Sequence, residues 1–151
     1  YRFTMEKMVP IIEEFCSFPA IEKAEFFKRV IFCYVTGNED MHLKNFSLIT
    51  KRGMTTLTPA YDLLNSSIAI KNPDEEIALT LKGKKSNLKA SDFIGYYAKE
   101  RLQLNNKTIE LILEQMQKVI PKWKELVEIS FLSDDMKERY FNILESRLKM
   151  F

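Results

Sequence analysis

Two short β-type segments interrupt a sequence that otherwise has helical periodicity. Residues 46–50 and 54–58 are rich in β-forming residues, and Lys51, Arg52 and Gly53 stand between them. This arrangement predicts a β-hairpin. Antiparallel strands joined by a tight turn bring their outer ends side by side. The residues just before the first strand and just after the second strand are therefore expected to lie close together.

Apolar residues at helical spacing predict helices on both sides of the hairpin. We expect helices over Met5–Cys16 and Ile21–Val35, a helix to about Leu104 capped by Ser91, one from Asn106 or Lys107 that Pro121 kinks or breaks, and a last one from Ser133. A second strand pair is expected at residues 68–70 and 77–81, around a loop at 71–76. The predicted fold is one domain over residues 1–151, mainly α with a small β-hairpin insertion.

The composition is that of a globular protein without a membrane span. The chain is 46% apolar and 29% charged, and no apolar stretch approaches the roughly 18 residues that crossing a bilayer requires. A net charge of +2 is too small to predict direct binding to nucleic acid. Cys16 and Cys33 lie in apolar helical runs without a CxxC pair, so we expect reduced core thiols in a cytoplasmic protein.

Residues 37–48, GNEDMHLKNFSL, place several polar groups before the hairpin. Asn45 directly precedes the first strand and Asp62 follows the second, so the hairpin should bring the two side chains together. An amide oxygen and a carboxylate are hard ligands that suit Mg²⁺, which completes its shell with phosphate and water. Asp40 can act as a base, and Lys44 can neutralise charge on a transferring phosphoryl group. This order of parts matches the catalytic logic of protein kinases.

Each of these residues also has an alternative interpretation without function. Asp and Asn are favoured in turns and caps, and Lys44 can be a solvated cation. His42 is as readily a scaffold that holds the loop as a nucleotide contact, and Tyr61 is as readily a core residue. The basic loop at residues 82–89 is interpreted as a solvated loop, with an acidic partner or phosphate as the alternative.

The sequence resembles the signature of the HipA family of bacterial serine/threonine kinases, the toxins of toxin–antitoxin pairs. The matching residues are Gly37, Asn38, Asp40, His42, Lys44, Asn45 and Ser47, followed by Pro59, Tyr61, Asp62, Leu63 and Leu64. The segment from Leu79 to Leu88 also looks like this family, so the resemblance runs from about Phe3 to the last helix. It implies a kinase-like C-lobe built as a helical bundle.

The resemblance also implies roles for individual residues. Asp40 would be the catalytic base, and Asn45 and Asp62 would bind Mg²⁺. The phosphates of ATP would be lined by His42, Leu43, Lys44, Asn45, Tyr61 and Asp62. The implied partners are a protein substrate, an aminoacyl-tRNA synthetase in the best-known members, and a helix-turn-helix antitoxin.

A kinase also needs an N-lobe with a glycine-rich loop and a strand lysine. The four glycines of this chain, at positions 37, 53, 83 and 95, form no such loop, and only helical patterns precede residue 37. The chain also starts at Tyr1, so we expect a piece of a longer protein that is inactive without an N-lobe. The alternatives are a non-catalytic module that binds an antitoxin or a separate N-lobe chain, and another Mg²⁺-dependent enzyme acting on a small molecule.

Overall fold

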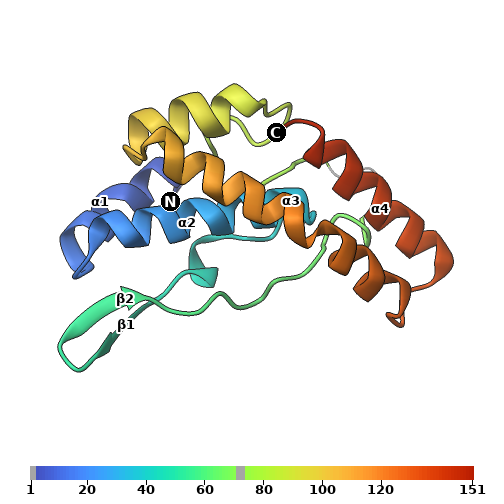
Figure 1. Ribbon diagram of the computed structural model, residues 1–151, viewed down its shortest axis with the longest axis horizontal. Helices are drawn as coiled ribbons and strands as arrows, with labels where there is room; N and C mark the ends of the chain where they lie inside the picture. The colour runs from blue at the N-terminus through green and yellow to red at the C-terminus, as the bar shows by residue number, and fades with distance from the viewer. Residues whose placement is uncertain (1–2, 71–73) are drawn as a thin grey trace.

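The structure is a computed structural model that describes residues 3–70 and 74–151 (Figure 1). Helices dominate it, and one two-stranded antiparallel sheet interrupts them, which confirms the predicted fold class. The elements are η1 (Met5–Lys7), α1 (Met8–Phe15), α2 (Pro19–Val35), η2 (Leu43–Asn45), β1 (Leu48–Lys51), β2 (Met54–Leu57), η3 (Asp92–Arg101), α3 (Asn106–Glu128) and α4 (Asp134–Leu148). No helix among these described residues is long and apolar enough to span a membrane.

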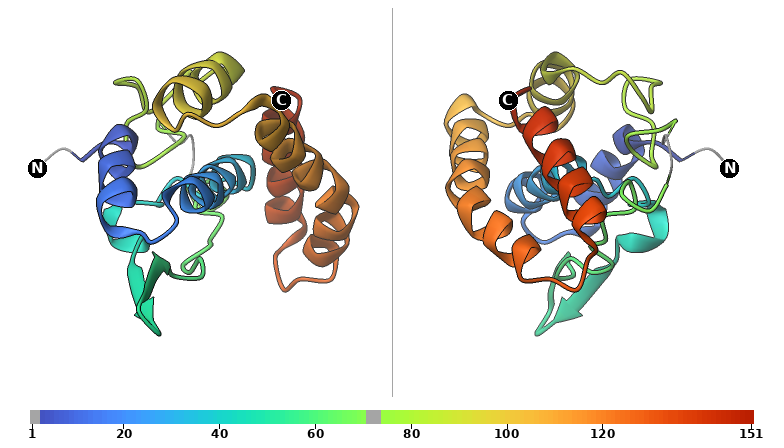
Figure 2. Two further views of the ribbon diagram at one scale, coloured as in Figure 1. Left: turned by 60° about the vertical axis from the view of Figure 1, so that its left-hand side comes forward. Right: turned by 90° about the vertical axis from the view of Figure 1, so that its right-hand side faces the viewer.

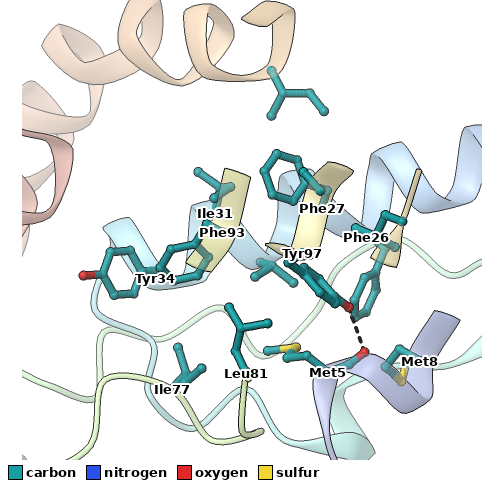
Figure 3. Packing of buried hydrophobic residues seen from close by; sticks show 14 of the residues in the cluster. Met5, Met8, Phe26, Phe27, Ile31, Tyr34, Ile77, Leu81, Phe93 and Tyr97 are labelled. Atoms are coloured by element: carbon teal, nitrogen blue, oxygen red, sulfur yellow. Dashed lines mark hydrogen bonds between the residues drawn. The ribbon is translucent and has the colours of Figure 1, made fainter. Parts of the chain in front are cut away.

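Helix α2 forms the centre of the molecule, with α3 and α4 side by side against it (Figure 2). Its buried face carries Phe26, Phe27, Val30, Ile31 and Tyr34 (Figure 3). The π-helix η3 packs on the same face, where the Phe93 ring lies 4.6 Å from the Tyr34 ring and the Tyr97 ring lies 6.4 Å from the Phe26 ring. The apolar periodicity that predicted α2 is thus the periodicity of the core.

The hairpin projects away from the helices (Figure 1). Leu48 pairs with Leu57 and Lys51 pairs with Met54, so a two-residue turn joins the strands. Both turn residues, Arg52 and Gly53, have positive φ, at 51° and 76°. This is the geometry of a type I′ turn, whose twist matches that of the strands. The hairpin prediction is confirmed, although the strands are shorter than the predicted segments.

The second predicted strand pair is wrong. Residues 68–70 form a turn, and residues 77–81 make only isolated bridges, from Thr80 to Thr4 and from Leu81 to Lys84. The intervening loop was predicted at 71–76, of which 71–73 lie outside the described residues. The alternating residues Ile77, Leu79 and Leu81 are all buried, so this segment does have the alternating burial of an extended chain. The backbone partner is the N-terminal segment, with the Met5 N–H donating to the Thr80 carbonyl at 3.0 Å.

Two predicted helix boundaries also differ from the structure. The predicted break at Pro121 is wrong, because helix α3 continues through this residue to Glu128. Just beyond it the Trp123 ring packs on Phe32, with ring centroids 5.2 Å apart. Ser91 has helical backbone angles and caps nothing. The Asp92 carboxylate instead accepts from the Lys89 N–H at 3.1 Å. The predicted start of the last helix is confirmed, because the Ser133 side chain accepts from the N–H of residue 136.

The basic loop at residues 82–89 makes contacts within the chain. Lys84 pairs with Asp92 at 3.2 Å, and Lys85 pairs with Glu75 at 2.8 Å. The Lys82 ammonium lies 5.3 Å from the centre of the Tyr96 ring. Lys82, Lys84 and Lys85 therefore take part in contacts that connect this loop to the rest of the fold. Cys16 and Cys33 are both free and buried, as the sequence predicted.

Candidate active site

The loop that follows α2 is positioned by a close contact with residues 65–67. Gly37 has a φ of +77°, and a Cβ at this position would lie 2.7 Å from the Asn65 Oδ1. The Gly37 carbonyl accepts from the Ser67 N–H at 3.1 Å, and the Glu39 N–H donates to the Ser66 hydroxyl at 3.0 Å. A glycine is needed here both for the left-handed backbone and for the space.

Asn45 and Asp62 meet as the hairpin geometry predicted. The Asn45 Nδ2 donates to the Asp62 Oδ2 at 2.5 Å, across 17 positions of sequence. Asn45 is buried, and its Oδ1 accepts from the His42 N–H at 3.1 Å. The hairpin therefore brings these two side chains into direct contact at its open end.

Asp62 has a φ of 56°, a left-handed conformation that costs free energy in a residue with a Cβ. The buried Asn38 side chain supports it, because its Nδ2 donates to the Asp62 carbonyl at 3.1 Å. The same amide accepts from the Asp40 N–H through its Oδ1 at 3.2 Å. Asn38 thus links the backbones of the two acidic residues.

Sequence reasoning did not assign Asn38 a role, although the residue stands in the quoted motif. The signal that could have found it is its position directly after Gly37 at the end of an apolar helix. A polar side chain at that point must find partners when it is buried. Asp40 is a local partner in the same loop, whereas the Asp62 carbonyl comes near Asn38 only in the folded chain.

The other predicted site residues surround this pair. Asp40, Leu43 and Lys44 are exposed, so their side chains are free to meet a ligand. His42 is half-buried, and its Nδ1 is buried without a hydrogen-bond partner among the described residues. The His42 side chain, at the start of η2, faces the backbone N–H of Asn45, so it helps to hold the loop.

Tyr61 links the loop to the segment before Asp62. Its hydroxyl donates to the Lys44 carbonyl at 2.9 Å and lies 2.6 Å from the Ser47 hydroxyl. Tyr61 is 39% exposed, which excludes the core interpretation. Its contacts hold the loop beside the Asn45–Asp62 pair.

The donor set of the site fits Mg²⁺. Asn45 offers an amide oxygen, and Asp62 has one carboxylate oxygen that receives no hydrogen bond from the described residues. Mg²⁺ commonly takes one or two protein ligands and fills the remaining positions with phosphate oxygens and water. Within residues 3–70 and 74–151 no three His, Cys, Asp or Glu side chains form a metal-binding group. A site for an all-protein cage is therefore not present in these ranges.

Comparison with known proteins gives this constellation a family. A family model described as the HipA-like C-terminal domain matches residues 1–123. A Sinorhizobium fredii protein named "Putative kinase Y4dM" is 32% identical over 106 residues, which are 70% of this chain and 25% of that protein. A Haemophilus influenzae protein named "Putative kinase" is 43% identical over 47 residues, which are 30% of this chain and 14% of that protein. The chain spans a quarter or less of the length of these two relatives.

The fold has a solved counterpart. A chain of the Shewanella oneidensis MR-1 toxin–antitoxin complex of HipA, HipB and operator DNA superposes with a TM-score of 0.78 at 19% identity, covering 98% of this chain and 35% of that chain. At this identity the likeness shows the shared fold. The family model matches well over half of the sequence and includes residues 37–64, so the chain belongs to the family of HipA-like C-terminal domains.

Proposed function

We propose that this chain is the catalytic-loop part of a HipA-like serine/threonine protein kinase, which transfers the γ-phosphoryl group of ATP to a protein hydroxyl. The observation that carries the proposal is the contact between Asn45 and Asp62, 2.5 Å long, beside the exposed Asp40. A loop Asp, a loop Asn and an Asp after a hairpin are the parts that phosphoryl transfer by protein kinases requires.

Asn45 and Asp62 would hold Mg²⁺ through their side-chain oxygens. When bound, Mg²⁺ neutralises charge on the phosphate oxygens. The hydrogen bond from Asn38 to the Asp62 carbonyl would hold the backbone of this ligand in place.

Asp40 would orient the substrate hydroxyl and accept its proton. Its exposed carboxylate can reach a protein substrate, while its N–H is held by Asn38. Lys44 would place a positive charge beside the transferring phosphoryl group, which stabilises the charge of the transition state. His42, Leu43 and Tyr61 would line the remaining part of the site that binds the phosphates of ATP.

The proposal extends to the rest of the natural protein. ATP binding by a kinase requires a glycine-rich loop and a strand lysine ahead of the catalytic loop, and residues 1–36 contain neither motif. We propose that other parts of the natural protein supply them. The similar Shewanella structure contains HipA with HipB, which supports an antitoxin of that kind as a partner.

The test uses the natural-length protein with γ-labelled Mg-ATP and a mixture of Ser- and Thr-containing peptides. Asp62→Asn and Asp40→Asn should each lower label transfer by about 100-fold or more, since each removes a group used in the transition state. Asp74→Asn, an exposed acid away from the motif, is the matched control and should keep wild-type transfer. Undiminished transfer by Asp62→Asn would overturn the metal assignment.

A second measurement tests the dependence on other parts of the protein. Calorimetric titration of the 151-residue chain with Mg-ATP should show weak or undetectable binding. Tight binding by this chain alone would contradict the proposed need for an N-lobe.

A further inference from the structure

The last helix of the chain touches the end of the helix that leads into the catalytic loop. Figure 2 shows α4 lying across the C-terminal end of α2. The family model ends at residue 123, so α4 lies beyond the part that it matches. The contact joins segments more than 100 positions apart, which gives Arg147 of α4 a place next to Tyr34 of α2.

Arg147 contacts Tyr34 in two ways. Its Nη1 donates to the Tyr34 carbonyl at 2.6 Å, and its Cζ lies 4.8 Å from the centre of the Tyr34 ring. The ring is fully buried and also packs on Phe93, while its hydroxyl donates to the Met150 sulfur at 3.7 Å. A half-buried guanidinium held by a carbonyl and an aromatic face has little freedom to move.

The Tyr34 carbonyl is also the point where the helix becomes the loop. It accepts from the Gly37 N–H at 3.2 Å, and the next residue, Asn38, donates its N–H to the Cys33 carbonyl at 2.8 Å. The carbonyls at a helix C-terminus lack intrahelical partners and carry negative partial charge. A cation placed on this carbonyl stabilises the last turn of α2.

Charge links the same arginine to the loop itself. Burial lowers the pKa of the Arg147 guanidinium, and the nearby Tyr34, Glu76 and Glu39 oppose this shift. The Glu39 Oε1 is buried and has no hydrogen-bond partner among the described residues. Glu39 stands directly before Asp40, so the charge of Arg147 acts on the loop next to the proposed catalytic base.

We infer that Arg147 is a positioning residue for the catalytic loop: by holding the Tyr34 carbonyl, which also accepts from the Gly37 N–H, it sets the position of Asn38 and Asp40. This inference rests on the proposed phosphoryl transfer for its kinetic consequence. Its structural consequence, a firmer loop at residues 37–40, can be measured without any activity.

The experiment compares three variants of the natural-length protein. Arg147→Gln removes the charge, and Arg147→Lys keeps a cation that can reach the carbonyl and the ring. Arg139→Gln is the matched control on the same helix, where Arg139 pairs with Asp135 at 3.0 Å, four residues earlier. The measurements are kcat and KM for Mg-ATP, and hydrogen exchange of the Gly37 and Asn38 amides.

Arg147→Gln should lower kcat by about tenfold or more with KM changed less than about twofold, because a small displacement of reacting groups has large effects on rate. The Gly37 and Asn38 amides should exchange faster in the same variant. Arg147→Lys should recover most of both losses, and Arg139→Gln should behave as the wild type. A purely structural role would lower thermal stability without moving kcat or the loop amides, and that result would overturn the inference.

Failure of the proposed function gives a different result. If the wild-type protein transfers no phosphoryl group, the kinase proposal fails and the exchange measurement alone decides the role of Arg147. Faster exchange in Arg147→Gln, absent in Arg139→Gln, supports the positioning role. Unchanged exchange in Arg147→Gln overturns it.

Discussion

The side-chain amide of Asn38 donates to the main-chain carbonyl of Asp62 at 3.1 Å, across 24 positions of sequence. Through its Oδ1 the same amide accepts from the N–H of Asp40. One buried side chain therefore fixes the relative position of the proposed base and the proposed metal ligand. Their arrangement depends on Asn38 as well as on the hairpin.

We predict that Asn38→Ala destabilises the fold by about 1–3 kcal/mol, because it leaves the buried partners of the amide unpaired. Urea unfolding monitored by circular dichroism measures this change. Asn142→Ala is the control, since Asn142 is exposed on α4 and its replacement should change stability by about 0.5 kcal/mol or less. Equal stability of Asn38→Ala and Asn142→Ala would contradict the bridging role.

Gly37→Ala is expected to destabilise the fold more than Gly53→Ala. Both glycines have positive φ, at 77° and 76°, so the backbone cost of adding a Cβ is similar. At Gly37 the new Cβ would lie 2.7 Å from the Asn65 Oδ1, whereas nothing lies within 4 Å at Gly53. The difference in unfolding free energy between the variants should be about 1–3 kcal/mol, the usual cost of overpacking.

A double-mutant cycle identifies the cause of this difference. Combining Gly37→Ala with Asn65→Ala removes the side chain that the new Cβ would meet. The double variant should be less destabilised than the sum of the single variants, with an interaction energy of about 0.5 kcal/mol or more. Simple additivity would show that the space at Gly37 is not limited by Asn65.

Asp92 should make the stability of the protein depend on pH. Burial raises the pKa of the Asp92 carboxyl, but the Lys89 N–H and the Lys84 ammonium together outweigh burial, and the pKa lies below its ordinary value of 3.8. A carboxyl with a lowered folded-state pKa stabilises the fold above its ordinary pKa. This contribution is lost as the pH falls below 3.8 and through the folded-state pKa.

The measurement compares Asp92→Asn with the wild type by urea unfolding at pH 7 and near pH 3. At pH 7 the variant should be less stable by about 1.5–3 kcal/mol, the usual size of hydrogen bonds to a charged group. The gap should narrow at the lower pH, because the Asp92 carboxyl of the unfolded chain takes up a proton before that of the folded chain does. Asp74→Asn serves as the control. A gap that stays constant over this range would contradict the assignment.

Cys33 should resist thiol reagents in the folded protein. Burial raises the pKa of its thiol to about 12, so little thiolate forms at pH 8. We expect Cys33 to react with Ellman's reagent only after unfolding in guanidinium. The unfolded chain supplies the control rate, and rapid reaction of Cys33 in the native protein would contradict the packing beside Asn38, whose Nδ2 lies 4.0 Å from the Cys33 sulfur.

Much of the site followed from local patterns. The turn at Arg52 and Gly53 and the β-forming residues around it are enough to predict that Asn45 and Asp62 meet. The metal and nucleotide roles of these residues stay predictions. The position of Asn38 did not follow, because its partners Asp40 and Asp62 are brought together by contacts between distant segments.

Helix boundaries also differ in whether neighbouring residues or distant contacts determine them. The cap at Ser133 and the end of α2 before Gly37 depend on a few neighbouring residues, and both were predicted. Helix α3 continues through Pro121, and Trp123 just beyond it packs against Phe32, a tertiary contact that local propensity does not contain. Tertiary contacts can outweigh the cost of a proline in a helix.

The sequence by itself determined the helical class, the hairpin and the identity of the polar loop, because periodicity and turn chemistry act over a few residues. Only the tertiary structure decided that Thr80 bridges to the N-terminal segment and that Arg147 of the last helix meets Tyr34. The neighbouring residues of an extended segment or of an arginine do not determine which distant partner it contacts. The choice among them is made by burial of the shared core, which depends on the whole chain.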